Sequence, residues 1–425
     1  MESLKGKRLL ILGGSMWKEQ IRQFAQDTGI VLIAAGNNTG AGTFEIADEA
    51  YAVDSTDAEA MKALIREKQI DGVYLGGSEP VIAAACRYLQ ELHMPCYTTP
   101  LQWDALQNKA HLKELYLQHG LPVVPEYKIT EETIDTVSVA YPVITKPVDG
   151  SGSNGFSVCH DRQELKAGFQ TAKAFSASGQ VLVEKYVRND GIVVIGRVSN
   201  GEFRICTVED KYPVHYEKQG SFVVGMLLLE SKRKQEFCRL YEQRLNAMLR
   251  SVGIQEGPLW IEVFQNGDSY CFNEIGFRYG GSVTIFPTQY FCGINEVASD
   301  IYYALTGESR IDGFPSILPP AVAKEQRYCV YALHLKPGRI RDIRGMEELK
   351  RDSRVIAIPH SKSIGDTIPD TGSIYQVYGF VLFLYQTEDE LRSMIERIHN
   401  TLFFSDENGE NLLHRMIDPH KLQLR

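Results

Sequence analysis

The stretch that decides the fold reads YPVITKPVDGSGSNGFSVCH and spans residues 141–160. Its glycines Gly150, Gly152 and Gly155 match the pattern G-x-G-x-x-G. In a dinucleotide-binding fold this pattern follows a strand and opens a helix, but here strand-like apolar residues stand on both sides. The segment therefore predicts a strand–loop–strand flap whose backbone N–H groups bind phosphate oxygens, since a Cβ in place of glycine would keep the backbone away from the phosphate.

Other phosphate-binding classes do not fit the rest of the chain. Protein kinases combine a similar flap with H-R-D and D-F-G motifs, and neither motif occurs in this sequence. The P-loop pattern G-x-x-x-x-G-K-[ST] is also absent from it. A plain Gly/Ser hairpin without a ligand remains the alternative for this segment taken alone.

Charged residues elsewhere in the chain fit a triphosphate site beneath the flap. Lys146 ends the first strand four residues before Gly150, so its ammonium can lie under the same phosphates. Glu262 and Glu274 stand inside apolar segments on the two arms of a predicted hairpin. Buried carboxylates are costly unless cations pair with them, and two that converge predict Mg²⁺, which binds carboxylate and phosphate oxygens. A salt bridge with Lys or Arg is the alternative for this pair.

The composition excludes several classes of protein. The 425 residues carry a net charge of −9, whereas a protein that binds duplex nucleic acid needs a basic surface. The longest uncharged apolar segments have the length of a strand and are too short to span a bilayer. The eight cysteines are scattered without zinc-ligand spacing, so reduced thiols and a cytoplasmic location are predicted.

The pattern of elements changes along the chain. Alternating strands and helices in the first part predict an α/β unit with a parallel sheet. Gly13–Ser15 and Gly76–Glu79 follow predicted strands, and loops in this position form the ligand crevice of such sheets, although glycines also serve simply as tight turns. Later segments, beginning with a predicted strand at Val123–Lys128, mix short strands, hairpins and helices, which predicts α+β architecture.

Taken in order, Lys109, Lys146, the glycine flap, the acidic pair Glu262 and Glu274, and Arg278 form a pattern. This pattern resembles the ATP-grasp superfamily of carboxylate–amine ligases, in particular its L-amino-acid ligase and carbamoyl-phosphate-synthase-like members. The resemblance implies an ATP-grasp fold with α/β and α+β parts. Four domains are expected: an N-terminal Rossmann-like parallel-sheet domain (1–104), a helix with a lid (105–187), a catalytic antiparallel-sheet domain (188–312) and a small C-terminal α+β domain (313–425).

The resemblance also gives roles to individual residues. Those implied in ATP binding are Lys109, Lys146, Gly150, Ser151, Gly152, Ser153, Gly155, Glu184, Lys185, Tyr186, Val187 and Asp190. Those implied in catalysis are Lys146, Lys211 and Arg278, and the implied ligands of Mg²⁺ or Mn²⁺ are Glu262 and Glu274. The candidates for substrate binding are Glu79, His215, Arg278, Gly281 and Ser282.

Two positions depart from the family pattern. The family often reads E-x-N-x-R at the second metal carboxylate, but Gly276 stands where the Asn would be. This departure implies that one metal is bound more weakly or that a water replaces the amide ligand. The bacterial L-amino-acid ligases also look like they carry Gly there. The ribose-binding acid usually falls at the position of Gly191, so Asp190 is the expected substitute.

The implied function is an ATP- and Mg²⁺-dependent ligase. It would activate a small carboxylate, such as an amino acid or a derivative, as an acyl phosphate, join it to an amine, and release ADP and phosphate. Its partners would be small molecules, with no nucleic acid and no membrane, and the resemblance implies a homodimer. Two alternatives are a non-catalytic ATP-binding or sensing protein and an ATP-grasp carboxylase-type enzyme. A nicotinamide oxidoreductase is disfavoured because Gly13-Gly14-Ser15 lacks the dinucleotide pattern.

Overall fold

A computed structural model describes residues 4–149, 155–187, 191–217, 221–266, 269–319 and 326–424. The N-terminal part is a parallel sheet with strand order β3-β2-β1-β4. Its strands are β1 (Arg8–Ile11), β2 (Val31–Ala35), β3 (Glu49–Tyr51) and β4 (Gly72–Tyr74). The neighbouring helices are η2 (Ser15–Trp17), α1 (Lys18–Thr28), α2 (Gly42–Ile46), α3 (Ala58–Glu67) and α4 (Glu79–Glu91).

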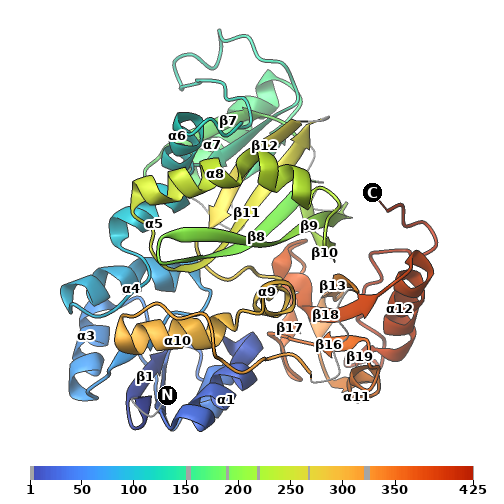
Figure 1. The fold of residues 1–425 in the computed structure, drawn as a ribbon. Coiled ribbons are helices and arrows are strands. Elements are labelled where there is room, and N and C mark those ends of the chain that lie inside the picture. Colours follow the sequence, from blue (N-terminus) through green and yellow to red (C-terminus); the bar gives the residue numbers. More distant parts are fainter. Residues whose placement is uncertain are drawn as a thin grey trace.

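Two further helices connect this sheet to a smaller one. They are α5 (Pro100–Gln107) and α6 (Lys109–Gln118). The smaller sheet has the order β6-β5-β7 and holds the strands on both sides of the glycine flap. Its elements are β5 (Val143–Pro147), β6 (Ser157–Cys159), α7 (Arg162–Phe175) and β7 (Val181–Lys185). Figure 1 shows this sheet at the top of the molecule, opposite the N-terminal sheet.

The centre of the molecule is an antiparallel sheet of eight strands in the order β12-β11-β8-β9-β10-β13-β18-β16. Its first part contains β8 (Ile192–Ser199), β9 (Glu202–Tyr216), β10 (Ser221–Leu229), β11 (Gly257–Asn266) and β12 (Ser269–Gly276). The C-terminal region adds β13 (Arg327–His334), β16 (Val355–Ala357) and β18 (Val377–Tyr385). Because β10 pairs with β13, the C-terminal strands continue the central sheet.

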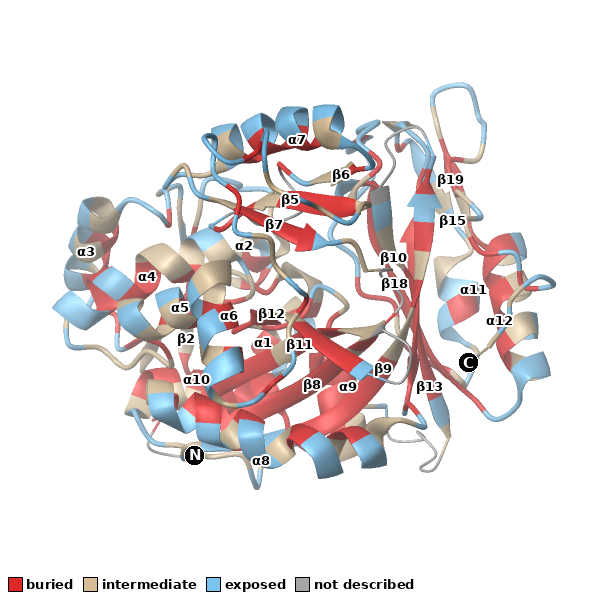
Figure 2. Cartoon of the chain, turned by 90° about the horizontal axis from the view of Figure 1, so that it is seen from above, coloured by how far each residue is buried: buried red, intermediate tan, exposed pale blue. Residues whose placement is uncertain are grey.

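Helices cover both faces of the central sheet. On one face, Ile192 and Val194 of β8 join a core with Phe237 and Leu245 of α8 (Lys234–Val252), whose exposed positions lie on the outer side in Figure 2. On the other face, α9 (Ile285–Cys292) and α10 (Glu296–Thr306) pack near β9 and the N-terminal sheet. Successive side chains of a strand point to opposite faces of the sheet. Residues of β8 and β9 that do not face α8 therefore face the interior of the molecule.

The C-terminal region completes its own core around α12 (Glu388–Thr401). The smaller elements there are β14 (Gly338–Arg339), β15 (Asp342–Arg344), α11 (Met346–Lys350), β17 (Thr367–Ile368), η3 (Ile374–Gln376) and β19 (Phe403–Ser405). The mixed architecture, with one parallel and one large antiparallel sheet, confirms the predicted fold class. The four domain boundaries stay a prediction.

One predicted strand is wrong. The segment Val123–Lys128 makes only isolated bridges, from Val123 to Phe272 and from Glu126 to Glu184. Pro122 precedes it and Pro125 lies within it, and a proline has no N–H to donate to a strand ladder.

Two further observations bear on the predicted setting of the protein. No helix in the described ranges has both the length and the apolar character needed to cross a bilayer. All eight cysteines are free thiols.

Candidate active site

A cavity of about 490 Å³ lies between the small sheet and the inner face of the central sheet. It brings together most of the candidate residues that the structure describes, which are separated by up to 173 positions in the sequence. The candidates that line it are Lys109, Lys146, Lys185, Tyr186, Val187, Lys211, Glu262, Glu274, Gly281 and Ser282. The fold therefore brings these residues, which were named from the sequence alone, to the wall of one cavity.

The acidic pair owes its position to a bulge in the hairpin of β11 and β12. Glu262 lies directly opposite Glu274, where Cβ atoms come within about 5 Å of each other. The next pair is Val263 and Phe272, so Asn273 has no residue opposite it. A bulge re-aims side chains that would otherwise alternate, and Asn273 lines the cavity together with its neighbour Glu274. Strict strand alternation places Asn273 on the other face, which is why the sequence analysis missed it.

Hydrogen bonds and ion pairs hold this cluster together. The Lys211 ammonium pairs with Glu262 Oε1. Asn273 Nδ2 donates to Glu262 Oε2 at 2.5 Å, and Lys146 Nζ donates to Asn273 Oδ1 at 3.2 Å. The central sheet and the small sheet are thus joined through the side chain of Asn273.

The two carboxyl groups have different protonation preferences. Burial opposes ionisation of Glu262, but Lys211, Asn273 and Lys146 together outweigh it and lower the pKa of that carboxyl. Burial and the negative charge of Glu262 both raise the pKa of Glu274. A divalent cation would relieve this repulsion, and carboxylate and amide oxygens are the donors that Mg²⁺ prefers.

Two carboxylates can hold such an ion when water and phosphate oxygens fill its other coordination positions. Within the described part of the chain, no three His, Cys, Asp or Glu side chains converge on one point. Two carboxylates therefore leave most positions of an octahedral ion to water and phosphate oxygens, which is the usual arrangement where Mg²⁺ binds with a nucleotide.

Glu184 has a different setting from the one expected. The sequence analysis placed it in the adenine-binding segment, and the structure buries its carboxylate between two lysines. Lys113 Nζ lies 2.5 Å from Glu184 Oε1, and Lys146 Nζ lies 2.6 Å from Oε2. Burial opposes the charge of Glu184, but Lys146 and Lys113 together lower its pKa. Lys113 is not among the residues predicted from the sequence, although it follows Lys109 by one helical turn and so shares a helix face with it.

Lys109 stands at the first position of α6. The side chain of Asn108 caps the helix by accepting from the N–H groups of Ala110 and His111. The backbone N–H of Lys109 donates to the carbonyl of Val148 at 2.9 Å, which fixes the helix start beside the end of β5. Burial lowers the pKa of the Lys109 ammonium.

Arg278 lies outside the cavity lining and is bound to Glu79. Its Nε and Nη2 atoms are 2.9 Å and 2.5 Å from Glu79 Oε1, and its guanidinium lies 5.3 Å from the centre of the Trp260 ring. The pair links the loop after β12 to the start of α4 in the N-terminal part. Two substrate candidates, one acidic and one basic, are therefore paired with each other in this structure.

The remaining candidates divide into two groups. His215 is exposed, stacks on Phe222 at 4.6 Å between ring centres, and does not line the cavity. Gly155 has a left-handed φ of 73°, and a Cβ there would lie 2.8 Å from Phe175. The candidates that lie outside the described residues are Gly150, Ser151, Gly152, Ser153 and Asp190.

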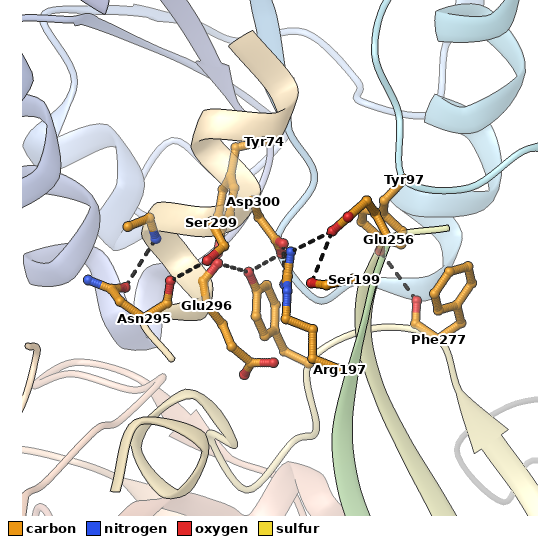
Figure 3. Close-up of polar contacts among 12 residues, drawn as sticks. Tyr74, Tyr97, Arg197, Ser199, Glu256, Phe277, Asn295, Glu296, Ser299 and Asp300 are labelled. Atoms are coloured by element: carbon orange, nitrogen blue, oxygen red, sulfur yellow. Dashed lines mark hydrogen bonds and ion pairs between the residues drawn. The ribbon is translucent and has the colours of Figure 1, made fainter. Parts of the chain in front are cut away.

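A buried network supports the loop that carries Arg278 (Figure 3). Arg197 of β8 is 2 % exposed and binds Asp300 of α10 at 2.5 Å and Glu256 at 3.3 Å. The hydroxyl of Tyr279, the residue after Arg278, also donates to Asp300. Buried charges need partners of this kind, so the network fixes the loop after β12 between the central sheet and α10.

Comparisons with known proteins agree with this geometry. Residues 139–285 match the family of the ATP-grasp domain, and residues 332–405 match the L-amino acid ligase C-terminal domain 2. The chain therefore carries an ATP-grasp domain, followed by a domain of the L-amino acid ligase type.

Individual relatives of this ATP-grasp protein are distant. A formate-dependent phosphoribosylglycinamide formyltransferase of Prochlorococcus marinus (strain MIT 9303) is 25% identical over 280 residues, 64% of this chain and 69% of the relative. An L-amino acid ligase from Bacillus licheniformis has a TM-score of 0.73 at 18% identity and covers 95% of this chain and 100% of its own. A phosphoribosylglycinamide synthetase from Anaerococcus prevotii has a TM-score of 0.72 at 14% identity, with coverage of 95% and 100%.

Proposed function

We propose that the cavity binds ATP with Mg²⁺ and that the protein joins an amino acid or a similar small carboxylate to an amine through an acyl phosphate. The observation that carries this proposal is the meeting of Glu262, Glu274, Lys146 and Lys211 on the wall of one cavity. The C-terminal region matches a domain of L-amino acid ligases, and this match supports an amino acid as the carboxylate substrate.

The residues of the small sheet would hold the nucleotide. Lys146 and the glycine flap would bind the phosphates, while the segment Lys185–Val187 lines the cavity where an adenine would lie. Lys109 would bind a phosphate from the other side, because α6 begins beside the end of β5. Glu184 would act on the phosphates only indirectly, by orienting the Lys146 ammonium through their ion pair.

Phosphoryl transfer brings a carboxylate and a triphosphate together, so the barrier is largely electrostatic. Lys146 and Lys211 would offset the negative charge at fixed positions, and preorganised charge of this kind lowers such barriers by several kcal/mol. Glu262 and Glu274, with the amide of Asn273 beside them, would hold Mg²⁺, which when bound neutralises phosphate oxygens. Arg278 would reach the transferring phosphoryl group only after its guanidinium separates from Glu79.

Carboxylate-dependent release of ADP tests the proposal. Each standard amino acid is supplied with Mg-ATP, singly and in pairs, and ADP is measured. We expect release that needs two amino acids or an amino acid and another amine, and that stops when Mg²⁺ is chelated. Tight ATP binding by calorimetry with no ADP release over the whole panel would instead indicate a nucleotide-sensing protein.

A further inference from the structure

One acidic residue on the cavity wall is not used by the proposed phosphoryl transfer. Glu209 of β9 lines the cavity but is 0% exposed. Among the described residues, neither of its carboxyl oxygens has a hydrogen-bond partner. A buried carboxyl without a partner costs free energy of folding, so its place on the wall of a ligand cavity calls for an explanation.

The register of the sheet places Glu209 near the reacting groups. Glu262 lies opposite Val193, and Val193 lies opposite Glu209, so the two glutamates stand two strands apart in one row. Two strand spacings amount to about 10 Å. Lys211 follows Glu209 by two residues on the same face of β9, and its ammonium pairs with Glu262. A small molecule that touches Glu209 would therefore reach toward the proposed phosphoryl-transfer site.

Few polar groups surround the carboxyl of Glu209. Across the sheet it lies opposite Val193 and Leu229. Tyr328 of β13 interacts with it electrostatically, and that buried hydroxyl also has no partner among the described residues. Burial alone raises the pKa of Glu209 to about 8. A ligand with a positive charge would gain most from this setting, because the attraction between opposite charges is strong where water is excluded.

A comparison with a second buried glutamate, Glu296, can distinguish a ligand-binding role of Glu209 from a structural one. Glu296 of α10 is 1% exposed, and burial likewise raises its pKa to about 8, although the charge of Arg197 and a hydrogen bond with Thr288 each lower it. However, Glu296 does not line the cavity and lies instead near Arg197. The two residues share burial and chemistry and differ in access to the cavity.

We propose that Glu209 receives the ammonium group of the amine substrate and takes a proton from it before the amine attacks the acyl phosphate. The proposal rests on the proposed function and adds the site of the second substrate, a primary amine that is protonated in solution.

The reacting form of Glu209 is the carboxylate, which predominates above its pKa of about 8. The ammonium gives one proton to this carboxylate, and the freed nitrogen lone pair forms the C–N bond at the acyl carbon. The bond from that carbon to the phosphate oxygen then breaks. The departing phosphate takes the second proton from the nitrogen and leaves as hydrogen phosphate, so the products are an amide, phosphate and protonated Glu209.

Trapping with hydroxylamine tests the two halves of the reaction separately. Hydroxylamine is uncharged near neutral pH and attacks acyl phosphates without a base, giving a hydroxamate. For Glu209→Gln, with the amino acids identified by ADP release, we expect hydroxamate formation within about threefold of wild type. Amide formation should fall by at least about 100-fold, which is about 2.7 kcal/mol, with a raised KM for the amine. Glu209→Asp should retain more amide formation than Glu209→Gln.

Glu296→Gln is the matched control, and it should leave both half-reactions within about threefold of wild type. Thermal unfolding of each variant shows that it is folded, and both Gln variants should be at least as stable as wild type because each removes a buried carboxyl. Equal amide formation by Glu209→Gln and wild type would overturn the role of Glu209. An equal loss of both half-reactions would overturn it too, by indicating a structural effect. Absence of hydroxamate from the wild-type protein with every amino acid would overturn the proposed function itself, and the amine site with it.

Discussion

At the scale of single residues, the paired environment of Glu184 allows a sharp comparison. Lys146 and Lys113 both bind its carboxylate, at 2.6 Å and 2.5 Å, but only Lys146 lines the cavity. Removing either lysine leaves Glu184 with one cation fewer. A difference in activity between the two variants therefore reports on the cavity, whereas a shared loss of stability reports on the ion pairs.

We expect Lys146→Met to lower kcat/KM for ATP by at least about 100-fold, the effect of losing one fixed charge at a transition state. Lys113→Met should lower it by less than about tenfold, or about 1.4 kcal/mol. Steady-state kinetics of ADP release measure both values, and urea unfolding measures both stabilities. Similar kinetic losses in the two variants would contradict a direct role for Lys146.

The residue types could be predicted from the sequence, but not all of their partners. Lys146, Glu262 and Glu274 stand out as charges within apolar segments. The pairing of Arg278 with Glu79 joins residues 199 positions apart, and no local pattern encodes such a contact. Glu209 was missed for a related reason: it reads as one more charge in Glu209-Asp210-Lys211, and only the sheet register shows that it faces the cavity.

At the scale of elements, the end of β12 explains why the family's usual Asn is missing at position 276. A Cβ on Gly276 would lie 1.9 Å from Nε1 of Trp260, so the indole ring occupies the space of any side chain there. Asn273, brought to the cavity by the bulge, provides the amide in this region instead. The sequence shows that Gly276 departs from the family pattern, but it does not show that the indole ring of Trp260 fills the space beside it.

We expect Gly276→Ala to destabilise the protein by about 1–3 kcal/mol, as overpacking of a filled site does. Gly281→Ala is the matched control for stability, because nothing lies within 4 Å of the Cβ that it adds. Urea denaturation at constant m-value measures both. If the two variants were equally stable, Trp260 would not occupy the space beside Gly276.

At the scale of the whole molecule, buried charge between the N-terminal and central sheets sets how stability depends on pH. Burial, with a further contribution from Asp300, raises the pKa of Glu296 to about 8 from 4.5, and Arg197 only partly offsets this. The folded protein therefore keeps a proton on Glu296 at pH values where the unfolded chain has lost it. Between these two pKa values the stability of the fold falls as pH rises, by up to about 1.4 kcal/mol per pH unit, and it levels off above the folded pKa.

Glu296→Gln removes the part of this pH dependence that comes from Glu296. The variant should gain stability relative to wild type as the pH is raised from about 5 to about 8, because the wild type loses stability over that range and the amide does not titrate. Urea unfolding at several pH values measures the difference. A difference that stays constant with pH would show that Glu296 ionises in the folded state as it does in the unfolded chain.

The two kinds of sheet could be predicted because their signals are periodic and local. A parallel sheet follows from alternating strands and helices, and an antiparallel sheet from successive strands joined as hairpins. The continuation of the central sheet into β13 and β18 was not foreseen, since pairing between β10 and β13 is a contact across a long stretch of chain. The buried network at Arg197 has the same character, because its four members, Arg197 included, come from four separate segments.

The proposed reaction begins when a carboxylate attacks the terminal phosphate of ATP in the cavity beside Glu262 and Glu274. Isotope transfer tests this step: the active amino acid is supplied with ¹⁸O in both carboxyl oxygens, and the mass of the released phosphate is measured. We expect each phosphate to carry one ¹⁸O atom, transferred from the carboxylate through the acyl phosphate. Phosphate that is released without the label would contradict it.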